Sequence, residues 1–264
     1  MPFVQAGELL MHVQERGRGT PLVMIMGLSG DLTWWERLAP LLESDFRLIT
    51  FDNRGAGLTE KPDAKYTIAG MAADAAALLE ALGIPRSHVF GVSMGGMIAQ
   101  ELALRFPERV DRLALGCTHS GGEGLKPPSV EIIRKITETR GKSLRQIAEE
   151  VMTVLFSPRF LARDPAYVRT MIDRYVEHPP SGKGFTRQFW AVVAHDAFER
   201  LPQIRHTTLV LTGDADTLVP PENSEVLHSR IPGSRLTWLR EAGHAFFMED
   251  PGETARHLRE HFLG

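Results

Sequence analysis

The sequence predicts an α/β fold: a mostly parallel sheet with helices on both faces and a helical segment inserted before the last strands. Two observations predict it. From Pro21 to Leu115, apolar runs of strand length alternate with stretches of helical period, as in successive βαβ units. Between about residues 118 and 200 only helical patterns follow one another, and the alternation returns at His206.

Six strands are expected before the insertion, each from a short apolar run with β-branched or aromatic residues. They lie at residues 3–6, 9–15, 21–26, 46–51, 87–92 and 110–115. The first two form a hairpin that turns at Gly7 and Glu8. The other four are typical of strands buried on both faces. In a parallel sheet the loops that follow such strands meet at one edge, and ligands bind there.

Helices are expected between these strands, at residues 34–42, at 67–82 and directly after residue 93. The helix at 67–82 has apolar side chains at a helical period and is followed by Gly83 and Pro85, which end helices. The core resumes after the insertion with further strands and helices. We expect these at residues 206–211, 221–230, 234–239 and 251–262.

The inserted segment is predicted to be a helical cap. It opens with a connector rich in glycine and proline and has an internal loop at residues 179–182. Its helical patterns lie at residues 130–137, 144–156, 166–178 and 185–198. We therefore divide the chain into a core of residues 1–117 and 201–264 and a cap of residues 118–200.

Composition excludes several classes of protein. The chain has 264 residues, 43% of them hydrophobic, which is ample for one large domain with an insertion. A net charge of −3 provides no basic surface for nucleic acid or for a membrane. The single cysteine, Cys117, allows no intrachain disulfide. No signal-peptide pattern and no apolar run of membrane-spanning length is present, so we expect a cytoplasmic protein. Whether it is a monomer or a homodimer stays open.

The first chemical motif is the sequence Gly-Val-Ser-Met-Gly at residues 91–95, which fits the G-x-S-x-G nucleophile elbow. Small residues two positions on either side of Ser93 allow the close backbone approach that such a strained turn needs. The helix that follows leaves N–H groups free to bind negative charge. An ordinary glycine-rich turn is the alternative. The strand before and the helix after favour a catalytic Ser93.

A serine hydroxyl is a weak nucleophile unless a base takes its proton. His244 follows an expected strand and a glycine, where its side chain would lie at the carboxyl edge of the sheet. His257 and His261 belong to a charged terminal helix, and His206 begins a strand rather than ending one. His244 is therefore the predicted base.

The base needs a carboxylate that holds its ring in the right tautomer. Asp214 directly follows Gly213, a position where a turn or cap role is the ordinary expectation. Asp216 lies farther out on the same loop and has more reach toward the serine. We predict that Asp216 is the acid. The order Ser, Asp, His along the chain is the one found with the nucleophile elbow.

These stretches together make the chain resemble the α/β-hydrolase-fold serine hydrolases, in the branch of esterases, enol-lactone hydrolases and carbon–carbon bond hydrolases. The matching stretches are residues 51–57, 91–96, 213–220 and 243–244, with 249–251 following. In that family the acid stands three residues after the glycine and before Val-Pro, which falls on Asp216 here. The resemblance implies the α/β-hydrolase fold, a Ser-His-Asp triad and no metal or organic cofactor.

The resemblance also implies an oxyanion hole formed by the backbone N–H groups of Leu28 and Met94. The family's usual His-Gly after the first central strand is Met26-Gly27 in this chain. Backbone donors survive a change of side chain, so the hole should persist, and the change concerns the support of the loop. Thr59 stands where a serine is more usual.

The expected activity is hydrolysis of small, fairly apolar carboxylic esters or lactones through an acyl-enzyme. One alternative is cleavage of carbon–carbon bonds in vinylogous diketo acids, which needs a carboxylate-binding arginine such as Arg54, Arg169 or Arg187. Cofactor-free haloperoxidase activity is another, and so is a ligand receptor that keeps the triad but turns over slowly. Ser93 argues against dehalogenases and epoxide hydrolases, which use an aspartate nucleophile.

Two further patterns receive structural interpretations. The pattern H-x-x-E-H at residues 257–261 occurs in zinc peptidases, but here it suits the solvent face of the last helix. Of Trp34 and Trp35, we expect one to anchor a helix in the core and the other to border the site. Large apolar side chains of the cap could pack or line a pocket, which periodicity does not distinguish. They are Met152, Phe156, Phe160, Met171, Tyr175, Phe189, Trp190 and Phe198.

Overall fold

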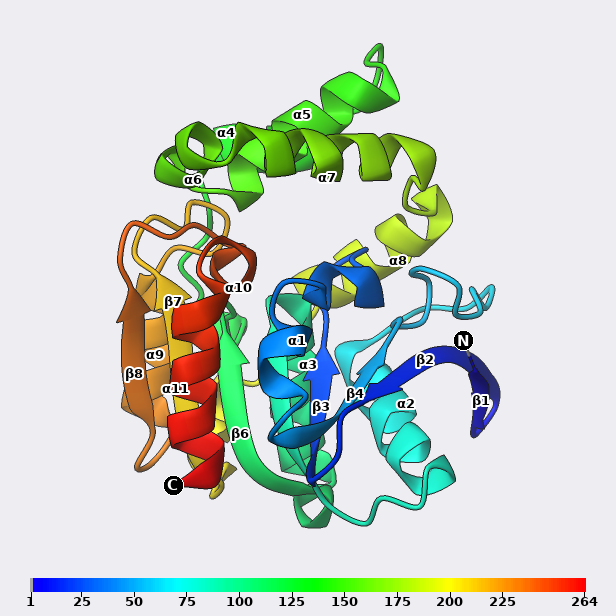
Figure 1. Ribbon diagram of the computed structural model, residues 1–264, viewed down its shortest axis with the longest axis vertical. Coiled ribbons are helices and arrows are strands. Elements are labelled where there is room, and N and C mark those ends of the chain that lie inside the picture. Colours follow the sequence, from blue (N-terminus) through cyan, green and yellow to red (C-terminus); the bar gives the residue numbers. More distant parts are fainter. Residues whose placement is uncertain (1) are drawn as a thin grey trace.

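Eight strands form one twisted sheet in the computed structural model, which describes residues 2–264 (Figure 1). They are β1 (Phe3–Ala6), β2 (Leu9–Arg16), β3 (Thr20–Ile25), β4 (Phe46–Phe51), β5 (Ser87–Val92), β6 (Val110–Gly116), β7 (Thr207–Gly213) and β8 (Arg235–Leu239). Their order across the sheet is β1-β2-β4-β3-β5-β6-β7-β8. The β1–β2 and β2–β4 pairs are antiparallel, and every pair from β4 to β8 is parallel. The predicted fold class is confirmed.

Helices cover both faces of this sheet (Figure 1). Those of the core are η1 (Leu32–Trp35), α1 (Ala39–Leu42), α2 (Ile68–Ala81), α3 (Met94–Arg105), η2 (Pro107–Arg109), α9 (Glu222–Arg230), α10 (Phe246–Glu249) and α11 (Pro251–Leu263). Those between β6 and β7 are η3 (Gly122–Gly124), α4 (Val130–Thr137), α5 (Leu144–Leu155), α6 (Pro158–Arg163), α7 (Pro165–Glu177), α8 (Gly182–Val193) and η4 (Phe198–Gln203).

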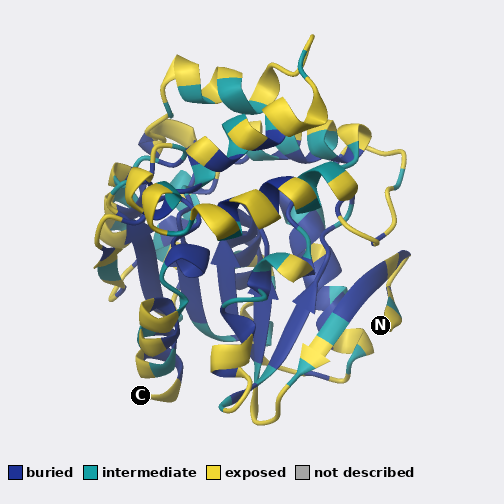
Figure 2. Cartoon of the chain, turned by 45° about the horizontal axis from the view of Figure 1, so that its top comes forward, coloured by how far each residue is buried: buried dark blue, intermediate teal, exposed yellow. Residues whose placement is uncertain are grey.

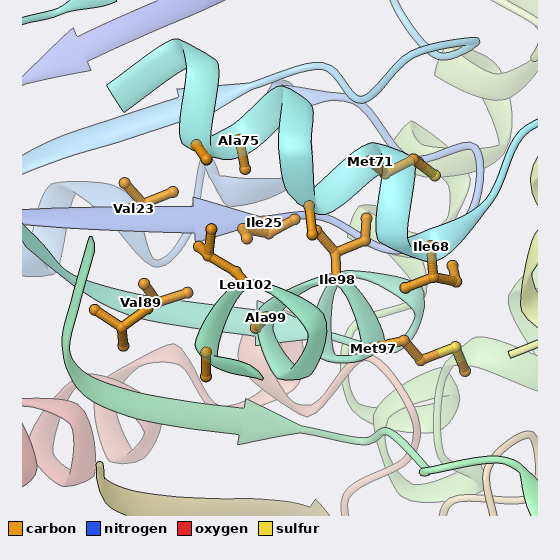
Figure 3. Close-up of a cluster of buried hydrophobic side chains, with 14 of the residues drawn as sticks. Val23, Ile25, Ile68, Met71, Ala75, Val89, Met97, Ile98, Ala99 and Leu102 are labelled. Atoms are coloured by element: carbon orange, nitrogen blue, oxygen red, sulfur yellow. The ribbon is translucent and has the colours of Figure 1, made fainter. Parts of the chain in front are cut away.

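The apolar core forms one layer on each side of the sheet. On one side, α2 and α3 pack Ile68, Met71 and Ile98 against strand residues such as Val23 and Val89 (Figure 3). On the other, α1, α10 and α11 cover the strands, and side chains of α5, α6 and α7 extend the same cluster. Figure 2 shows the central strands largely buried and the outer faces of the helices exposed. Burial on both faces explains why these strands are continuous apolar runs.

Helices α4–α8 are inserted between β6 and β7 and lie over the carboxyl edge of the sheet as a cap (Figure 1). The chain leaves and re-enters the core at one place, where Gly121 and Asp196 form an isolated antiparallel bridge. The division of the chain at residues 118 and 200 stays a prediction. The bridge at Gly121 and Asp196 lies within a few residues of both boundaries.

The expected helix at residues 34–42 is wrong as a continuous element, because the structure has η1 and then α1 there. Pro40 lacks the N–H that a helix running through this position would need to bond Glu36. The last cap helix also ends earlier than expected, at Val193, because the chain turns there toward the Gly121–Asp196 bridge. The short helices α6 and α10 were not predicted, since four to six residues carry no readable helical period.

No helix within residues 2–264 is long and apolar enough to cross a bilayer.

Candidate active site

Ser93 lies in a sharp turn between β5 and α3, with φ of 56° and ψ of −125°. Residues other than glycine rarely adopt such backbone angles, so the turn is strained. A Cβ on Gly91 would lie 2.2 Å from the carbonyl oxygen of Gly95, and one on Gly95 would lie 2.0 Å from that of Ile25. The two glycines are therefore required by backbone contact. They lift Ser93 onto the carboxyl edge of the sheet.

His244 and Asp216 form a buried pair at the same edge. His244 Nδ1 lies 2.8 Å from Asp216 Oδ2, and the two side chains are 6% and 0% exposed. Asp216 Oδ1 accepts hydrogen bonds from the N–H groups of Leu218 at 2.8 Å and Val219 at 2.9 Å. An ionised carboxylate only accepts hydrogen bonds, so Nδ1 carries the proton and Nε2 keeps a lone pair. The pair is thus arranged for His244 to act as a base.

Asp214, the other acid considered, lies elsewhere. It is exposed, and its Oδ1 accepts the N–H of Glu241 at 2.5 Å. Asp214 therefore joins the loop after β7 to the loop after β8, which is the turn role expected for it.

Ser93 and His244 line one cavity of about 680 Å³ beneath the cap. Its wall is largely apolar and comes from the core and from the cap. The apolar side chains include Met26, Leu28, Leu32, Trp34, Leu58, Val92, Ile136, Val151, Leu155, Met171, Tyr175, Phe185, Leu218, Ala245 and Phe247. A cavity of this size and lining suits a small, mainly apolar molecule.

The two tryptophans divide as the sequence predicts. Trp34 lines the cavity, whereas Trp35 is buried against Phe90 and Phe247 with ring centroids 5.6 and 5.1 Å away. Of the cap side chains singled out in the sequence, Met171 and Tyr175 line the cavity. Phe156 and Phe160 stack on each other inside the cap instead.

The loop after β3, residues 26–30, lies against Ser93. A Cβ on Gly27 would come within 3.0 Å of Ser93 Cβ, so this backbone passes directly beside Ser93. Leu28 follows Gly27 on the cavity wall, and Met94 begins α3 directly after Ser93. The N–H groups of Leu28 and Met94 thus belong to the two segments that flank the Ser93 side chain, as the oxyanion-hole prediction requires.

A carboxylate, Glu249, links the His244 loop to the cap. It is 4% exposed, and its Oε1 accepts the N–H groups of Ser157 at 2.7 Å and Gly243 at 3.0 Å. Its Oε2 accepts the hydroxyl of Ser157 at 2.7 Å. Burial raises the pKa of Glu249 above its ordinary value, and these hydrogen bonds only partly offset that rise. The residue before the predicted base is therefore held against the start of α6.

Three arginines proposed from the sequence as carboxylate ligands do not line the cavity. Arg54 pairs with Asp74, Arg187 pairs with Asp63, and Arg169 is exposed on the cap. Arg174 of α7 lines the cavity instead. The sequence offered no signal for it, because its position depends on how the cap packs on the core.

The histidines of the H-x-x-E-H pattern and Cys117 do not have the metal-binding or nucleophilic roles that are common for these residue types. His261 is buried and its Nε2 donates to the carbonyl of Leu113 at 2.9 Å, whereas His257 pairs with Glu253 on the helix surface. The two histidines of the H-x-x-E-H pattern therefore have separate structural partners. Cys117 also lines the cavity, but burial raises the pKa of its thiol well above the ordinary value, which keeps it protonated.

Comparison with known proteins agrees with this geometry. A model of the alpha/beta hydrolase fold matches residues 20–251. RutD of Azorhizobium caulinodans, a proposed carbamate hydrolase, is 29% identical over 251 residues, covering 95% of this chain and 94% of that one. The 2-hydroxy-6-oxo-2,4-heptadienoate hydrolase of Pseudomonas putida is 28% identical over 255 residues, covering 92% and 88%. The crystal structure of the enol-lactonase of Burkholderia xenovorans LB400 superposes with a TM-score of 0.89 at 25% identity, covering 100% of both chains. With the family match spanning most of the chain and the motifs at the expected strand ends, the chain belongs to the α/β-hydrolase fold family.

Proposed function

We propose that this protein is a serine hydrolase that cleaves small, fairly apolar carboxylic esters or lactones. Ser93 is the nucleophile, His244 the base and Asp216 the acid that orients it. One observation carries the proposal: His244, which is bonded to the buried Asp216, and Ser93 in its strained turn line the same apolar cavity. Similarity to an enol-lactonase over the whole chain supports it.

The reaction follows from this arrangement in two stages. His244 Nε2 takes the Ser93 proton as Oγ attacks the acyl carbonyl, and the N–H groups of Leu28 and Met94 hold the resulting oxyanion. His244 then gives the proton to the leaving alcohol as the carbon–oxygen bond breaks. Water then attacks the acyl carbonyl as His244 takes its proton. The bond from the acyl carbon to Ser93 Oγ breaks, His244 returns the proton to Oγ, and the acid is released. Asp216 stays ionised and stabilises the imidazolium throughout.

The charges around Arg174 favour a substrate without a carboxylate. Arg174 Nη2 donates to Glu36 Oε2 at 2.7 Å, and Tyr167 donates its hydroxyl to Glu36 Oε1 at 3.0 Å. The positive charge of this cavity residue is thus already balanced by an acidic neighbour. A substrate carboxylate could reach Arg174 Nη1, which has no hydrogen-bond partner within residues 2–264, but it would lie beside the negative charge of Glu36.

Arg174 nevertheless makes carbon–carbon bond hydrolysis of vinylogous diketo acids the second candidate. It supplies a guanidinium on the cavity wall, and the heptadienoate hydrolase of Pseudomonas putida is a relative. Variation at this residue separates the candidates. Arg174→Met should leave the hydrolysis of uncharged esters within a few-fold of wild type, whereas an enzyme for diketo acids would lose most of its activity.

The test is hydrolysis of p-nitrophenyl esters from acetate to dodecanoate, with Ser93→Ala alongside. We expect rapid turnover with an optimum at a chain length that fills the cavity, and loss of turnover in Ser93→Ala. A p-nitrophenyl carbamate and a vinylogous diketo acid complete the panel. Equal activity in the variant would exclude Ser93 as nucleophile.

A wild-type protein that is inert on every ester would overturn the esterase proposal. Turnover of the diketo acid alone would then favour the second candidate. Binding without turnover would favour a receptor that keeps the triad.

A further inference from the structure

The loop that carries the Leu28 N–H group is strained. Ser29 has φ of 60°, in the left-handed region that residues with a Cβ occupy at a cost of roughly 1–2 kcal/mol. Such a conformation persists only where surrounding contacts hold it. The Met26 side chain has no N–H or O–H group, so hydrogen bonds that hold this loop come from other residues.

Two side-chain amides hold the loop on either side of Leu28. Before it, Asn53 Nδ2 donates to the carbonyl oxygen of Met26 at 2.8 Å. After it, Gln188 Oε1 accepts the N–H of Ser29 at 2.8 Å. Asn53 belongs to the core, but Gln188 lies on α8 of the cap, 159 residues away along the chain.

Gln188 is itself held on both sides. Its Nε2 donates to the carbonyl oxygen of Arg54 at 2.8 Å, and its side chain is fully buried. Because one partner is a donor and the other an acceptor, the orientation of the amide is determined. The Arg54 side chain is fixed in turn by two hydrogen bonds to Asp74 of α2. The Gln188 amide is therefore fixed in place and holds the Ser29 N–H group at a defined position.

Close backbone contact sets the distance between α8 and the core. A Cβ on Gly184 would lie 2.0 Å from the carbonyl oxygen of Gly55, so only glycine fits there. Gly184 and Gln188 are four residues apart and share one face of the helix. This contact brings the Gln188 amide within reach of the loop after β3.

We propose that Gln188 is a positioning residue for the oxyanion hole: through the Ser29 N–H it fixes the peptide next to the Leu28 donor, so that a helix of the cap completes the catalytic edge of the core. The proposal rests on the proposed function, which assigns the Leu28 N–H to the hole. The assignment of the nucleophile, base and acid does not by itself imply this support from the cap.

The expected effect concerns the transition state more than the ground state. The carbonyl oxygen of a bound ester gains negative charge only as Ser93 attacks, so a displaced donor weakens binding of the tetrahedral species. Removing an oxyanion donor outright costs roughly 100- to 1,000-fold in kcat. Displacing one by loss of its support should cost less, and we expect about 10- to 100-fold.

The experiment compares Gln188→Met with wild type on the best p-nitrophenyl ester of the panel. Met has a similar length but forms neither hydrogen bond. We expect kcat to fall about 10- to 100-fold with KM nearly unchanged. The affinity of an alkylboronic acid, which forms a tetrahedral adduct with Ser93 Oγ, should fall in proportion to kcat/KM. Lys183→Ala, an exposed change on the same helix, is the control and should match wild type.

A Gln188→Met variant with unchanged kcat and unchanged boronic acid affinity would overturn the inference. A rise in KM with kcat unchanged would also overturn it, because this result indicates a role in substrate binding. Neither result affects the proposed function, which fails separately if wild type is inert or if Ser93→Ala retains activity.

Hydrogen exchange of the wild-type protein provides a test that does not depend on folding of the variant. The Ser29 amide should be protected, because its bond to Gln188 lies under the cap. Exchange of this amide as fast as that of an exposed loop would contradict the proposal.

Discussion

At the scale of single residues, Asp216 depends on two backbone donors. The N–H groups of Leu218 and Val219 donate to Oδ1 of its carboxylate, and Oδ2 accepts the hydrogen bond from His244. Asp214, two residues earlier, lacks this arrangement and bonds Glu241 instead. Two aspartates that differ little in the sequence therefore have different roles, and a matched pair of variants can separate them.

Asp216→Asn should abolish most activity while preserving the fold. The amide oxygen can still accept from Leu218 and Val219, so the amide nitrogen faces His244 and forces its Nδ1 to accept a hydrogen bond. Nε2 then carries the proton and cannot act as a base. We expect kcat to fall about 10,000-fold. Asp214→Asn should retain near wild-type kcat, and a comparable loss in that variant would contradict the assignment.

The stability of the protein should fall in mild acid, in part because of His261. Burial lowers its pKa to about 4, whereas an unfolded chain has a histidine pKa near 6.5. As pH falls through this interval the unfolded state binds the proton first, so the free energy of unfolding decreases. One such group contributes a slope of up to about 1.4 kcal/mol per pH unit.

His261→Gln keeps an N–H donor for Leu113 but does not titrate. Urea unfolding between pH 7 and pH 4 should therefore show a shallower loss of stability in this variant than in wild type. Parallel curves for the two proteins would contradict the prediction.

At the scale of elements, the candidate site lies where the loops that follow the parallel strands meet. The loops after β3, β4, β5, β7 and β8 all open at one edge of the sheet because these strands are parallel. The cap meets this edge through α8 at the loop after β3 and through the start of α6 at the loop that carries His244. Substitution of two glycines of α8 can test how closely this helix packs against the core.

Gly184→Ala should reduce activity and stability, because its Cβ would lie 2.0 Å from the Gly55 carbonyl oxygen. Overpacking of this kind costs about 1–3 kcal/mol and would shift α8 away from the core. A Cβ on Gly182, by contrast, meets nothing within 4 Å. Gly182→Ala is thus the control, with unchanged kcat and equal or higher thermal stability. Equal behaviour of the two variants would show that α8 is not seated by this contact.

At the scale of the whole molecule, stability should be unevenly distributed. The residues of β5 and nearly all of α3 are buried between the two apolar layers. In the cap, α5 buries Ala148, Met152 and Val154, whereas α4 buries none of its residues and leaves Val130 67% exposed. Segments with few buried contacts open most easily.

Hydrogen exchange followed by mass spectrometry should therefore show the fastest helical exchange in α4. Peptides from α5 should be intermediate, and those from β5 and α3 should be slowest. Protection of α4 equal to that of α5 would contradict this order and would indicate that another molecule covers the helix in solution.

Local patterns were sufficient for most of the fold. The strands at residues 46–51 and 87–92 have the predicted bounds, because burial on both faces makes each a continuous apolar run. The helix at residues 130–137 also has its predicted bounds, and its amphipathic period is a property of the segment alone. The expected continuous helix at 34–42 was wrong because a single proline outweighed the apolar pattern.

The sequence by itself was sufficient to predict the fold class and to nominate Ser93, Asp216 and His244, since a nucleophile elbow and polar residues at strand ends are local features. It could not indicate that Gln188 bonds Ser29, that Glu249 bonds Ser157, or that Arg174 rather than Arg54 lines the cavity. The first two contacts join residues 159 and 92 positions apart, and Arg174 is bonded to Glu36, 138 positions away. Their partners are brought together only when the cap packs on the sheet, and no short-range pattern records that packing.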